Sequence, residues 1–308
     1  MDRLYDIVII GAGPAGMAAA IYAKRAKLSV IVIEKTGGCG GQVLSTYEVD
    51  NYPGLPGMGG YELSQAFRDH CDKMEVDFVT DEVVGIDVTN DIKQVFCEEN
   101  TFNCKSLIIA TGARHARLKV PGEDALSGAG VSYCATCDGA FFRNRTVAVV
   151  GGGDVAVEDA IFLARGCSKV YLIHRRNELR AAKKLQEALF ALDNVEMVWD
   201  STVDEIMGDD CVEGIKVTDV QTNAQSVLKV DGVFVAVGIL PNSNEFTGKL
   251  GIDEKGYIKA DESCRTSVAG VFAAGDVREK QLRQIITAVA DGANAVTSAE
   301  RYLTETKF

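Results

Sequence analysis

The sequence predicts an α/β protein with two Rossmann-like, three-layer ββα nucleotide-binding domains, the second inserted in the first. A glycine-rich fingerprint occurs twice, at residues 11–16 and 151–156. Each copy follows an apolar run and precedes a segment with helical character, the context that a dinucleotide-binding turn requires. Two further apolar runs, 105–112 and 270–276, lie on either side of the second copy. Near-continuous apolar runs are typical of strands in a parallel sheet that is covered on both faces.

The first fingerprint stands in a complete strand–turn–helix unit. Segment 6–10 is an apolar strand, 17–23 is a helix and 29–33 is a second strand. One glycine makes the tight turn, one lets backbone N–H groups approach a pyrophosphate, and one allows close packing of helix on strand. In this order they are Gly11, Gly13 and Gly16. A pyrophosphate would then lie at the helix N-terminus, where unpaired N–H groups and the helix dipole favour anions.

The second fingerprint repeats this layout. Segment 146–150 is the strand, 155–164 is the helix and 169–173 is the next strand. The turn positions are Gly151, Gly153 and Ala156. A lone glycine-rich loop is weak evidence, but the matching strand and helix context makes a second nucleotide site the favoured interpretation.

The two units have opposite charge after their second strand. In the first unit Glu34 can accept a hydrogen bond from a ribose 2′-OH and would repel a 2′-phosphate. That site therefore suits the ADP moiety of FAD or NAD. In the second unit the chain has His174, Arg175 and Arg176, and Arg180 follows one helical turn later. Because guanidinium groups pair bidentately with phosphate oxygens, this site is expected to prefer NADPH over NADH.

The second nucleotide unit is nested inside the first, and it closes with a strand at 233–238. We place the boundaries near residues 116 and 244. The expected domains are a discontinuous one, 1–115 with 245–308, and an inserted one, 116–244. Segment 283–303 is expected to be a long amphipathic helix. Its N-terminus would stabilise negative charge on a reduced flavin, although its periodicity fits an ordinary packing helix equally well.

Length and charge limit the classes of protein to consider. With 308 residues the chain is long for one domain, so two are expected. The net charge of −12 argues against nucleic acid or an anionic membrane surface as a partner. The apolar run that opens the chain is too short for a signal peptide or a membrane span. We therefore expect a cytoplasmic protein.

The nine cysteines are an odd number at low density, which does not indicate a disulfide scaffold. Most are interpreted as small buried residues of a protein in a reducing compartment. Cys97 and Cys104 flank an expected turn and could pair, but free thiols are favoured. Cys39 lies in a glycine-rich loop, where a tolerated small residue is favoured over a spare redox thiol.

Cys134 and Cys137 form a Cys-x-x-Cys motif that is followed directly by Asp138. In thiol–disulfide exchange a thiolate attacks and the leaving thiol takes up a proton, so an adjacent carboxylate is suited to proton transfer. The alternative is half of a zinc site. It is disfavoured because the chain has no second Cys-x-x-Cys and only three histidines. Beside two nucleotide sites, the dithiol indicates an electron relay that ends at a disulfide.

Together these residues match the motifs of a known protein family. The chain resembles the low-molecular-weight, bacterial-type thioredoxin reductases, of the class II pyridine nucleotide-disulfide oxidoreductase family, along essentially its whole length. The Cys-Ala-Thr-Cys-Asp-Gly core is highly specific. The matching motifs are Gly-x-Gly-Pro-Ala-Gly at 11–16, Gly-Gly-Gln at 40–42, Glu-Val-Asp-Asn-Tyr-Pro-Gly at 48–54, Ala-Thr-Gly at 110–112, Cys-Ala-Thr-Cys-Asp-Gly at 134–139, Gly-Gly-Gly-Asp-x-Ala at 151–156, His-Arg-Arg at 174–176 with Arg180, Gly-Asp-Val at 275–277 and Arg-Gln at 283–284.

The resemblance implies FAD on the discontinuous domain, NADPH on the inserted domain, thioredoxin as protein substrate and a homodimer. It also implies a rotation between the domains that presents the dithiol and the nicotinamide to the flavin in turn. By the same resemblance, Cys137 faces the flavin, Cys134 attacks the disulfide of thioredoxin, and Asp138 is the nearby acid–base.

The candidate catalytic residues are Cys134, Cys137 and Asp138, and no metal is expected. The candidate cofactor-binding residues of the first domain are Gly11, Gly13, Pro14, Ala15, Gly16, Glu34, Lys35, Gly41, Gln42, Asn51, Ala110, Thr111, Gly112, Gly275, Asp276, Arg283 and Gln284. Those of the second domain are Gly151, Gly153, Asp154, Val155, Ala156, Glu158, His174, Arg175, Arg176, Arg180 and Gly238.

Three other functions would fit part of this sequence. A related thioredoxin reductase fed by ferredoxin or another donor would lack the nucleotide arginines, which this chain has. A peroxide-defence reductase would carry an extra N-terminal thioredoxin-like segment, whereas here the first nucleotide strand begins at residue 6. A nucleotide-sensing or scaffold protein with a vestigial dithiol would bind FAD without turnover.

Overall fold

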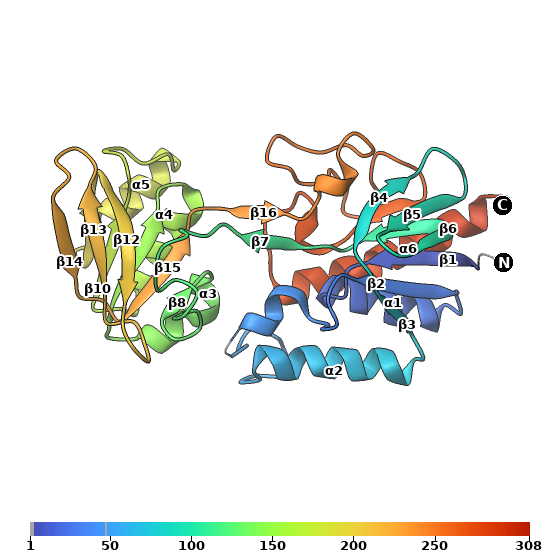
Figure 1. Cartoon of the computed structure of the whole chain (residues 1–308), viewed down its shortest axis with the longest axis horizontal. Coiled ribbons are helices and arrows are strands. Elements are labelled where there is room, and N and C mark those ends of the chain that lie inside the picture. The colour runs from blue at the N-terminus through green and yellow to red at the C-terminus, as the bar shows by residue number, and fades with distance from the viewer. Residues whose placement is uncertain (1–2, 47) are drawn as a thin grey trace. The chain divides into compact units, whose positions relative to one another are not determined.

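The computed structural model describes residues 3–46 and 48–308. The chain divides into two compact units: unit 1 is Met1–Arg114 with Leu240–Phe308, and unit 2 is His115–Ile239. Figure 1 shows the two ends of the chain, in blue and red, together in unit 1. The short strands β7 (Ala113–His115) and β16 (Ile239–Pro241) pair where the chain passes from one unit to the other.

Unit 1 is built on a seven-stranded sheet in the order β3-β2-β1-β6-β5-β4, with β17 paired to the end of β6. The pairs among β1, β2, β3, β6 and β17 are parallel, whereas β4, β5 and the first half of β6 form an antiparallel meander. The strands are β1 (Leu4–Ile10), β2 (Val30–Glu34), β3 (Asp77–Thr80), β4 (Val83–Asp87), β5 (Lys93–Cys97), β6 (Thr101–Ile109) and β17 (Val271–Ala273).

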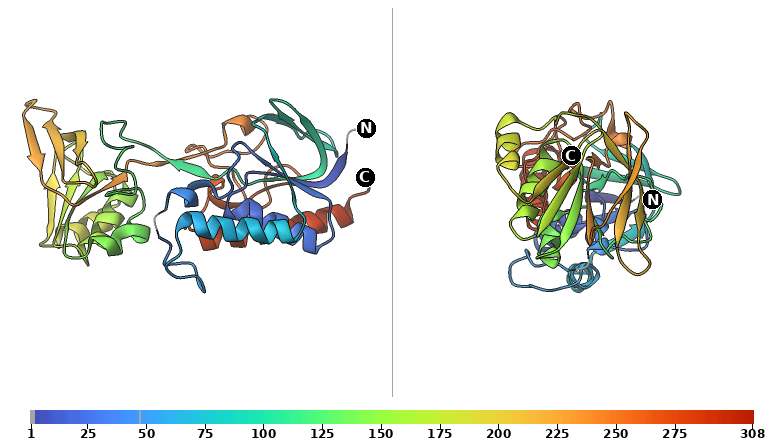
Figure 2. Two further views of the ribbon diagram at one scale, coloured as in Figure 1. Left: turned by 60° about the horizontal axis from the view of Figure 1, so that its bottom comes forward. Right: turned by 90° about the vertical axis from the view of Figure 1, so that its left-hand side faces the viewer.

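The α-helices of this unit are α1 (Pro14–Arg25), α2 (Gly60–Lys73) and α6 (Ile285–Glu305). Helices α1 and α6 pack on the sheet, and α2 packs against α1. Figure 2 shows α1 and α6 side by side on one face. Small residues allow this contact, because a Cβ on Gly292 of α6 would overlap the carbonyl oxygen of Ala15 in α1. Three 3-10 turns complete the unit, at Gly41–Ser45, Asn244–Phe246 and Gly275–Val277.

Unit 2 has a five-stranded parallel sheet in the order β11-β10-β9-β15-β8 and a separate antiparallel sheet, β12-β13-β14. The helices α3 (Ala135–Asp138), α4 (Asp154–Ala164) and α5 (Lys183–Phe190) connect strands of the parallel sheet. The strands are β8 (Val131–Ser132), β9 (Thr146–Gly151), β10 (Lys169–Ile173), β11 (Val195–Val198), β12 (Ser201–Met207), β13 (Gly214–Asp219), β14 (Gln225–Leu228) and β15 (Gly232–Ala236).

The predicted α/β fold is confirmed, with parallel strands at the centre of a sheet in each unit, and the strands after each fingerprint lie where the sequence predicts them. The long helix begins at Ile285 rather than at 283, because Gln284 is its N-cap and its backbone N–H is bound by Thr287. Cys97 and Cys104 are free. They lie on adjacent strands but out of register, since Cys104 pairs with Lys93 and Cys97 with Val83.

The contact between α1 and α6 gives a stability prediction. We expect Gly292→Ala to destabilise unit 1 by about 1–3 kcal/mol, since the added Cβ has no space against α1. Gly85→Ala is the matched control, because a Cβ there meets nothing within 4 Å. Urea unfolding followed by circular dichroism measures both, and equal midpoints for the two variants would contradict the packing argument.

Candidate functional site

The first fingerprint forms a close-packed turn with one open position. A Cβ on Gly11 would lie 2.5 Å from the carbonyl oxygen of Ala110, and one on Gly16 would overlap the carbonyl oxygen of Gly11. A Cβ on Gly13, in contrast, would meet nothing within 4 Å. Gly13 is the N-cap of α1 and Pro14 follows it. The backbone is therefore exposed at the helix N-terminus, where a pyrophosphate would bind.

Glu34 lies directly beside this turn. Its Oε2 accepts a hydrogen bond of 2.7 Å from the backbone N–H of Ala12, and its Oε1 accepts one of 3.3 Å from that of Thr36. These bonds hold the carboxylate at the end of β2 and keep it beside the fingerprint. Lys35 is exposed and pairs instead with Glu82, at 2.6 Å.

Residues far apart in the chain meet at the start of α6. Asn51 Nδ2 donates a hydrogen bond of 2.8 Å to Gln284 Oε1. A Cβ on Gly275 would lie 3.0 Å from that of Ala15, which places the Gly275–Val277 turn against the N-terminus of α1. A Cβ on Gly41 would lie 3.7 Å from Gly13 Cα. Candidate residues from four separate segments thus surround the first fingerprint.

Two buried polar atoms beside this turn have no hydrogen-bond partner within the described residues: Asp276 Oδ1 and Arg283 Nε. Burial raises the pKa of the Asp276 carboxyl, while the charges of Lys280 and Arg283 act in the opposite direction. Buried polar groups are almost always paired in folded proteins, so these two atoms indicate a polar ligand. With the open turn at Gly13, they fit a flavin nucleotide.

Thr111 has a role that the sequence did not predict. Its hydroxyl donates a hydrogen bond of 2.6 Å to the carbonyl oxygen of Asn242, and Asn242 Nδ2 donates one of 2.9 Å to the carbonyl oxygen of Thr111. The backbone N–H of Asn242 also binds the carbonyl oxygen of Gly112, at 3.0 Å. These three hydrogen bonds connect the segment at Thr111 and Gly112 to the segment at Asn242, next to the first fingerprint.

The second fingerprint has the same construction. A Cβ on Gly151 would lie 2.5 Å from the carbonyl oxygen of Ala236 and 2.6 Å from the Cβ of Ala156, whereas one on Gly153 would meet nothing within 4 Å. Asp154 Oδ1 accepts a hydrogen bond of 2.8 Å from the backbone N–H of Ala182. Val155 and Glu158, on α4, are exposed, and Gly238 follows β15 with φ +136°.

His174 differs in burial from the arginines that follow it. The histidine is buried, and its ring packs against Gly152, where a Cβ would overlap it. Burial lowers its pKa, and the charges of Arg180, Arg175 and Arg176 lower it further. The imidazole is thus uncharged at neutral pH, and its ring packs against the glycine turn at Gly152.

Arg175, Arg176 and Arg180 are exposed, and no carboxylate of the described chain forms an ion pair with them. The backbone N–H of Arg180 binds the carbonyl oxygen of Gly152 at 2.8 Å, which ties this basic cluster to the fingerprint. Three guanidinium groups without an acidic partner fit a doubly charged phosphate.

The candidate redox centre lies between β8 and η2, the 3-10 turn Gly139–Phe142, and Cys134 and Cys137 form a disulfide there. Ser132 connects the disulfide to Asp138: its hydroxyl donates a 2.6 Å hydrogen bond to Asp138 Oδ2 and accepts one of 3.1 Å from the backbone N–H of Cys134. The other carboxyl oxygen, Oδ1, is buried without a partner in the described structure. Burial raises the pKa of Asp138, and the bond from Ser132 opposes this only in part.

Seven cysteines are free, and four of them are buried. Cys211 is exposed, which the sequence interpretation did not foresee, and Cys39 accepts a hydrogen bond of 3.3 Å from Arg68. Within residues 3–46 and 48–308, no group of three or more potential ligands could hold a metal ion. No helix in the same part of the chain is long and apolar enough to cross a membrane.

Known proteins match this chain over nearly all of its length. The family model for pyridine nucleotide-disulphide oxidoreductase matches residues 5–292. A thioredoxin reductase of Listeria monocytogenes is 46% identical over 308 residues, covering 99% of this chain and 96% of that protein. The crystal structure of thioredoxin reductase from Streptococcus pyogenes is 45% identical, with a TM-score of 0.94, and covers 99% of this chain and 100% of that one.

A ferredoxin-flavin thioredoxin reductase of Clostridium acetobutylicum is also similar. It is 31% identical, with a TM-score of 0.54, and the match covers 99% of this chain and 100% of that one.

Asp159 on α4 gives a pH-dependent prediction. Burial raises the pKa of its carboxyl to about 7, and the neighbouring Glu158 contributes. In the unfolded chain this carboxyl has its ordinary, lower pKa and ionises first. The free energy of unfolding therefore falls as the pH rises from about 4 to 7. Asp159→Asn should therefore be as stable as the parent near pH 4 and more stable by about 1–2 kcal/mol at pH 8.

Urea unfolding at several pH values measures this difference. Asp210→Asn, the same substitution at an exposed position of the same unit, is the control. A difference between Asp159→Asn and the parent that is constant with pH would contradict the prediction.

Proposed function

The chain belongs to the pyridine nucleotide-disulphide oxidoreductase family, as a thioredoxin reductase, and from this premise we propose that electrons pass from NADPH through FAD to the Cys134–Cys137 disulfide and on to thioredoxin. The observation that carries the proposal is that disulfide, linked through Ser132 to the buried carboxyl group of Asp138. It follows β8, which belongs to the same parallel sheet as β9, the strand that leads into the second fingerprint.

Unit 1 is the proposed FAD domain. Its support is the open turn at Gly13, the carboxylate of Glu34, the Asn51–Gln284 pair and the unpaired buried atoms of Asp276 and Arg283. Bound FAD would supply a carrier that accepts a hydride from NADPH and passes two electrons to a disulfide. The acidic Glu34 disfavours a 2′-phosphate there, so NADPH is proposed to bind elsewhere.

Unit 2 is the proposed NADPH domain. Gly153 leaves the N-terminus of α4 open for a pyrophosphate, and the three arginines provide the donors for the 2′-phosphate. The same arginines favour NADPH over ferredoxin as the electron donor, because a ferredoxin-fed reductase has no use for a 2′-phosphate site.

The dithiol reaction needs a nucleophile, a resolving thiol and a proton carrier. Cys134 is proposed to attack thioredoxin's disulfide as a thiolate, and Cys137 then attacks the mixed disulfide so that Cys134–Cys137 forms again. Asp138 is suited to proton transfer at this site, because burial raises the pKa of its carboxyl above the ordinary value. Each turnover converts NADPH, one proton and one protein disulfide into NADP⁺ and a dithiol.

The proposal includes thioredoxin as the protein partner, a homodimer and a cytoplasmic location. The seven free cysteines support a reducing compartment. The homodimer and the choice of thioredoxin are carried by the resemblance to the family, and light scattering of the purified protein tests the first of them.

Cys134→Ser tests the order of the relay. Because Cys134 is proposed to act only after the flavin, the variant should lose thioredoxin reduction while NADPH still bleaches the flavin under anaerobic conditions. Cys211→Ser, which removes an exposed free thiol, should keep both activities. Loss of flavin bleaching in Cys134→Ser would count against this order, and no bleaching in the parent protein would point to another donor such as ferredoxin.

A double variant, Arg176→Ala with Arg180→Ala, tests the coenzyme preference. Removing two charge-assisted contacts to the 2′-phosphate should raise the KM for NADPH by about tenfold or more and leave that for NADH almost unchanged. Arg165→Ala, at an exposed arginine outside the cluster, controls for the loss of a surface positive charge elsewhere in unit 2. Steady-state kinetics with both nucleotides measures this, and an equal rise for both would refute the assignment.

A further inference from the structure

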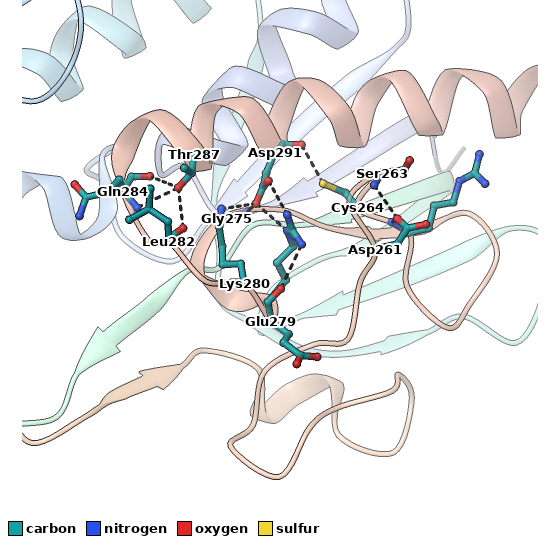
Figure 3. Close-up of polar contacts among 12 residues, drawn as sticks. Asp261, Ser263, Cys264, Gly275, Glu279, Lys280, Leu282, Gln284, Thr287 and Asp291 are labelled. Atoms are coloured by element: carbon teal, nitrogen blue, oxygen red, sulfur yellow. Dashed lines mark hydrogen bonds and ion pairs between the residues drawn. The ribbon is translucent and has the colours of Figure 1, made fainter. Parts of the chain in front are cut away.

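One buried carboxylate beside the FAD site has no role in the reaction just described. Asp291 lies on α6 with only 5% of its surface exposed. It accepts four hydrogen bonds from the segment 275–280 (Figure 3). Oδ2 is bound by the backbone N–H of Gly275 at 2.9 Å, by Arg278 Nε at 2.9 Å and by Lys280 Nζ at 2.8 Å, and Oδ1 is bound by Arg278 Nη2 at 3.0 Å.

These bonds hold segment 275–280 at both of its ends. Gly275 has φ +76° and leaves little room toward Ala15, so the turn can adopt few alternatives without moving α1. Asp291 binds this segment at its start, through Gly275, and near its end, through Arg278 and Lys280. Asp276 lies between these ties, and it carries the buried Oδ1 atom that has no partner in the described chain.

The charges of the cluster are not balanced within it. Arg278 and Lys280 both face Asp291, and the three side chains are almost fully buried. Burial alone would raise the pKa of Asp291, but the bonds from Arg278 and Lys280 lower it below its ordinary value. Asp291 is therefore ionised at neutral pH, and the cluster keeps one excess positive charge. That charge acts on the neighbouring Asp276 carboxyl.

We propose that Asp291 is a positioning residue of the FAD site: its carboxylate holds segment 275–280 against α1 and thereby directs Asp276 toward the flavin nucleotide. The inference rests on the proposed assignment of FAD to unit 1. Asp291 itself need not touch the nucleotide, since it acts through Gly275 and the residue that follows it. Its loss should therefore reduce the affinity for FAD more than it reduces the stability of the apoprotein.

The test compares Asp291→Asn with a matched control on the same helix. Asparagine keeps the shape of the side chain but presents an amide to two cations, so the ties to Arg278 and Lys280 should break. Ser298→Ala also removes a buried bond between α6 and a loop, the 2.8 Å bond to the carbonyl oxygen of Ser263, but it leaves segment 275–280 intact. The Kd for FAD is measured on each apoprotein by quenching of FAD fluorescence, and Tm is measured with and without FAD.

We expect the Kd of Asp291→Asn for FAD to rise by about tenfold or more and that of Ser298→Ala to stay within about twofold of the parent. Since the stabilisation by a ligand grows with the logarithm of the ratio of its concentration to Kd, the FAD-dependent increase in Tm should shrink in Asp291→Asn but not in Ser298→Ala. Lys280→Met loses one tie and keeps the Asp291–Arg278 pair, so a smaller rise of about threefold is expected.

Three results separate the possibilities. A lower apoprotein Tm for Asp291→Asn with an unchanged Kd for FAD would mean that the carboxylate is merely structural, and the inference would be overturned. If that variant does not fold, an unchanged Kd for Lys280→Met overturns it instead. If the parent protein binds no FAD, the proposed function fails, whatever the variants do.

Discussion

Close contact between backbone atoms around the N-terminus of α1 is the constraint on which the rest of unit 1 depends. A side chain at Gly16 would strike the preceding turn, and one at Gly292 would strike α1 itself. The helix is thus held against the sheet and against its neighbour α6, with its first turn open at Gly13. Because packed backbone adjusts little, the turn that carries Asp276 has to fit against the N-terminus of α1. The hydrogen bonds from segment 275–280 to Asp291 hold it there.

The sequence predicts a feature of this fold when the residues that form it are close together in the chain, and misses it when they are far apart. The fingerprints, the dithiol and the basic cluster are local patterns, and the strands and helices next to them lie where they were predicted. Asn242 and Asp291 act on segments far away in the chain, and no local pattern marks them. An acidic residue on an amphipathic helix is normally assigned to its polar face. The burial of Asp291 becomes apparent only with its two cationic partners in place.

The antiparallel sheets were missed for a related reason. The sheet β12-β13-β14 and the pair β4 and β5 carry no motif, and their mixed burial gives only a weak alternation. His174 shows the opposite difficulty. It stands in the predicted motif, yet its ring is buried against Gly152, and the exposed side chains of the motif are those of the arginines. Spacing predicts which residues surround a turn, whereas packing decides which of them face a ligand.

The connectivity of unit 2 constrains how the proposed relay can work. The disulfide segment follows β8 and the second fingerprint follows β9, and β15 lies between these strands in one parallel sheet. Both segments leave the carboxyl edge of the same sheet, so their separation is fixed by it. With NADPH in unit 2, as proposed, the nucleotide and the dithiol would therefore be held by neighbouring strands of one sheet, and the spacing of β9, β15 and β8 would set the distance between them.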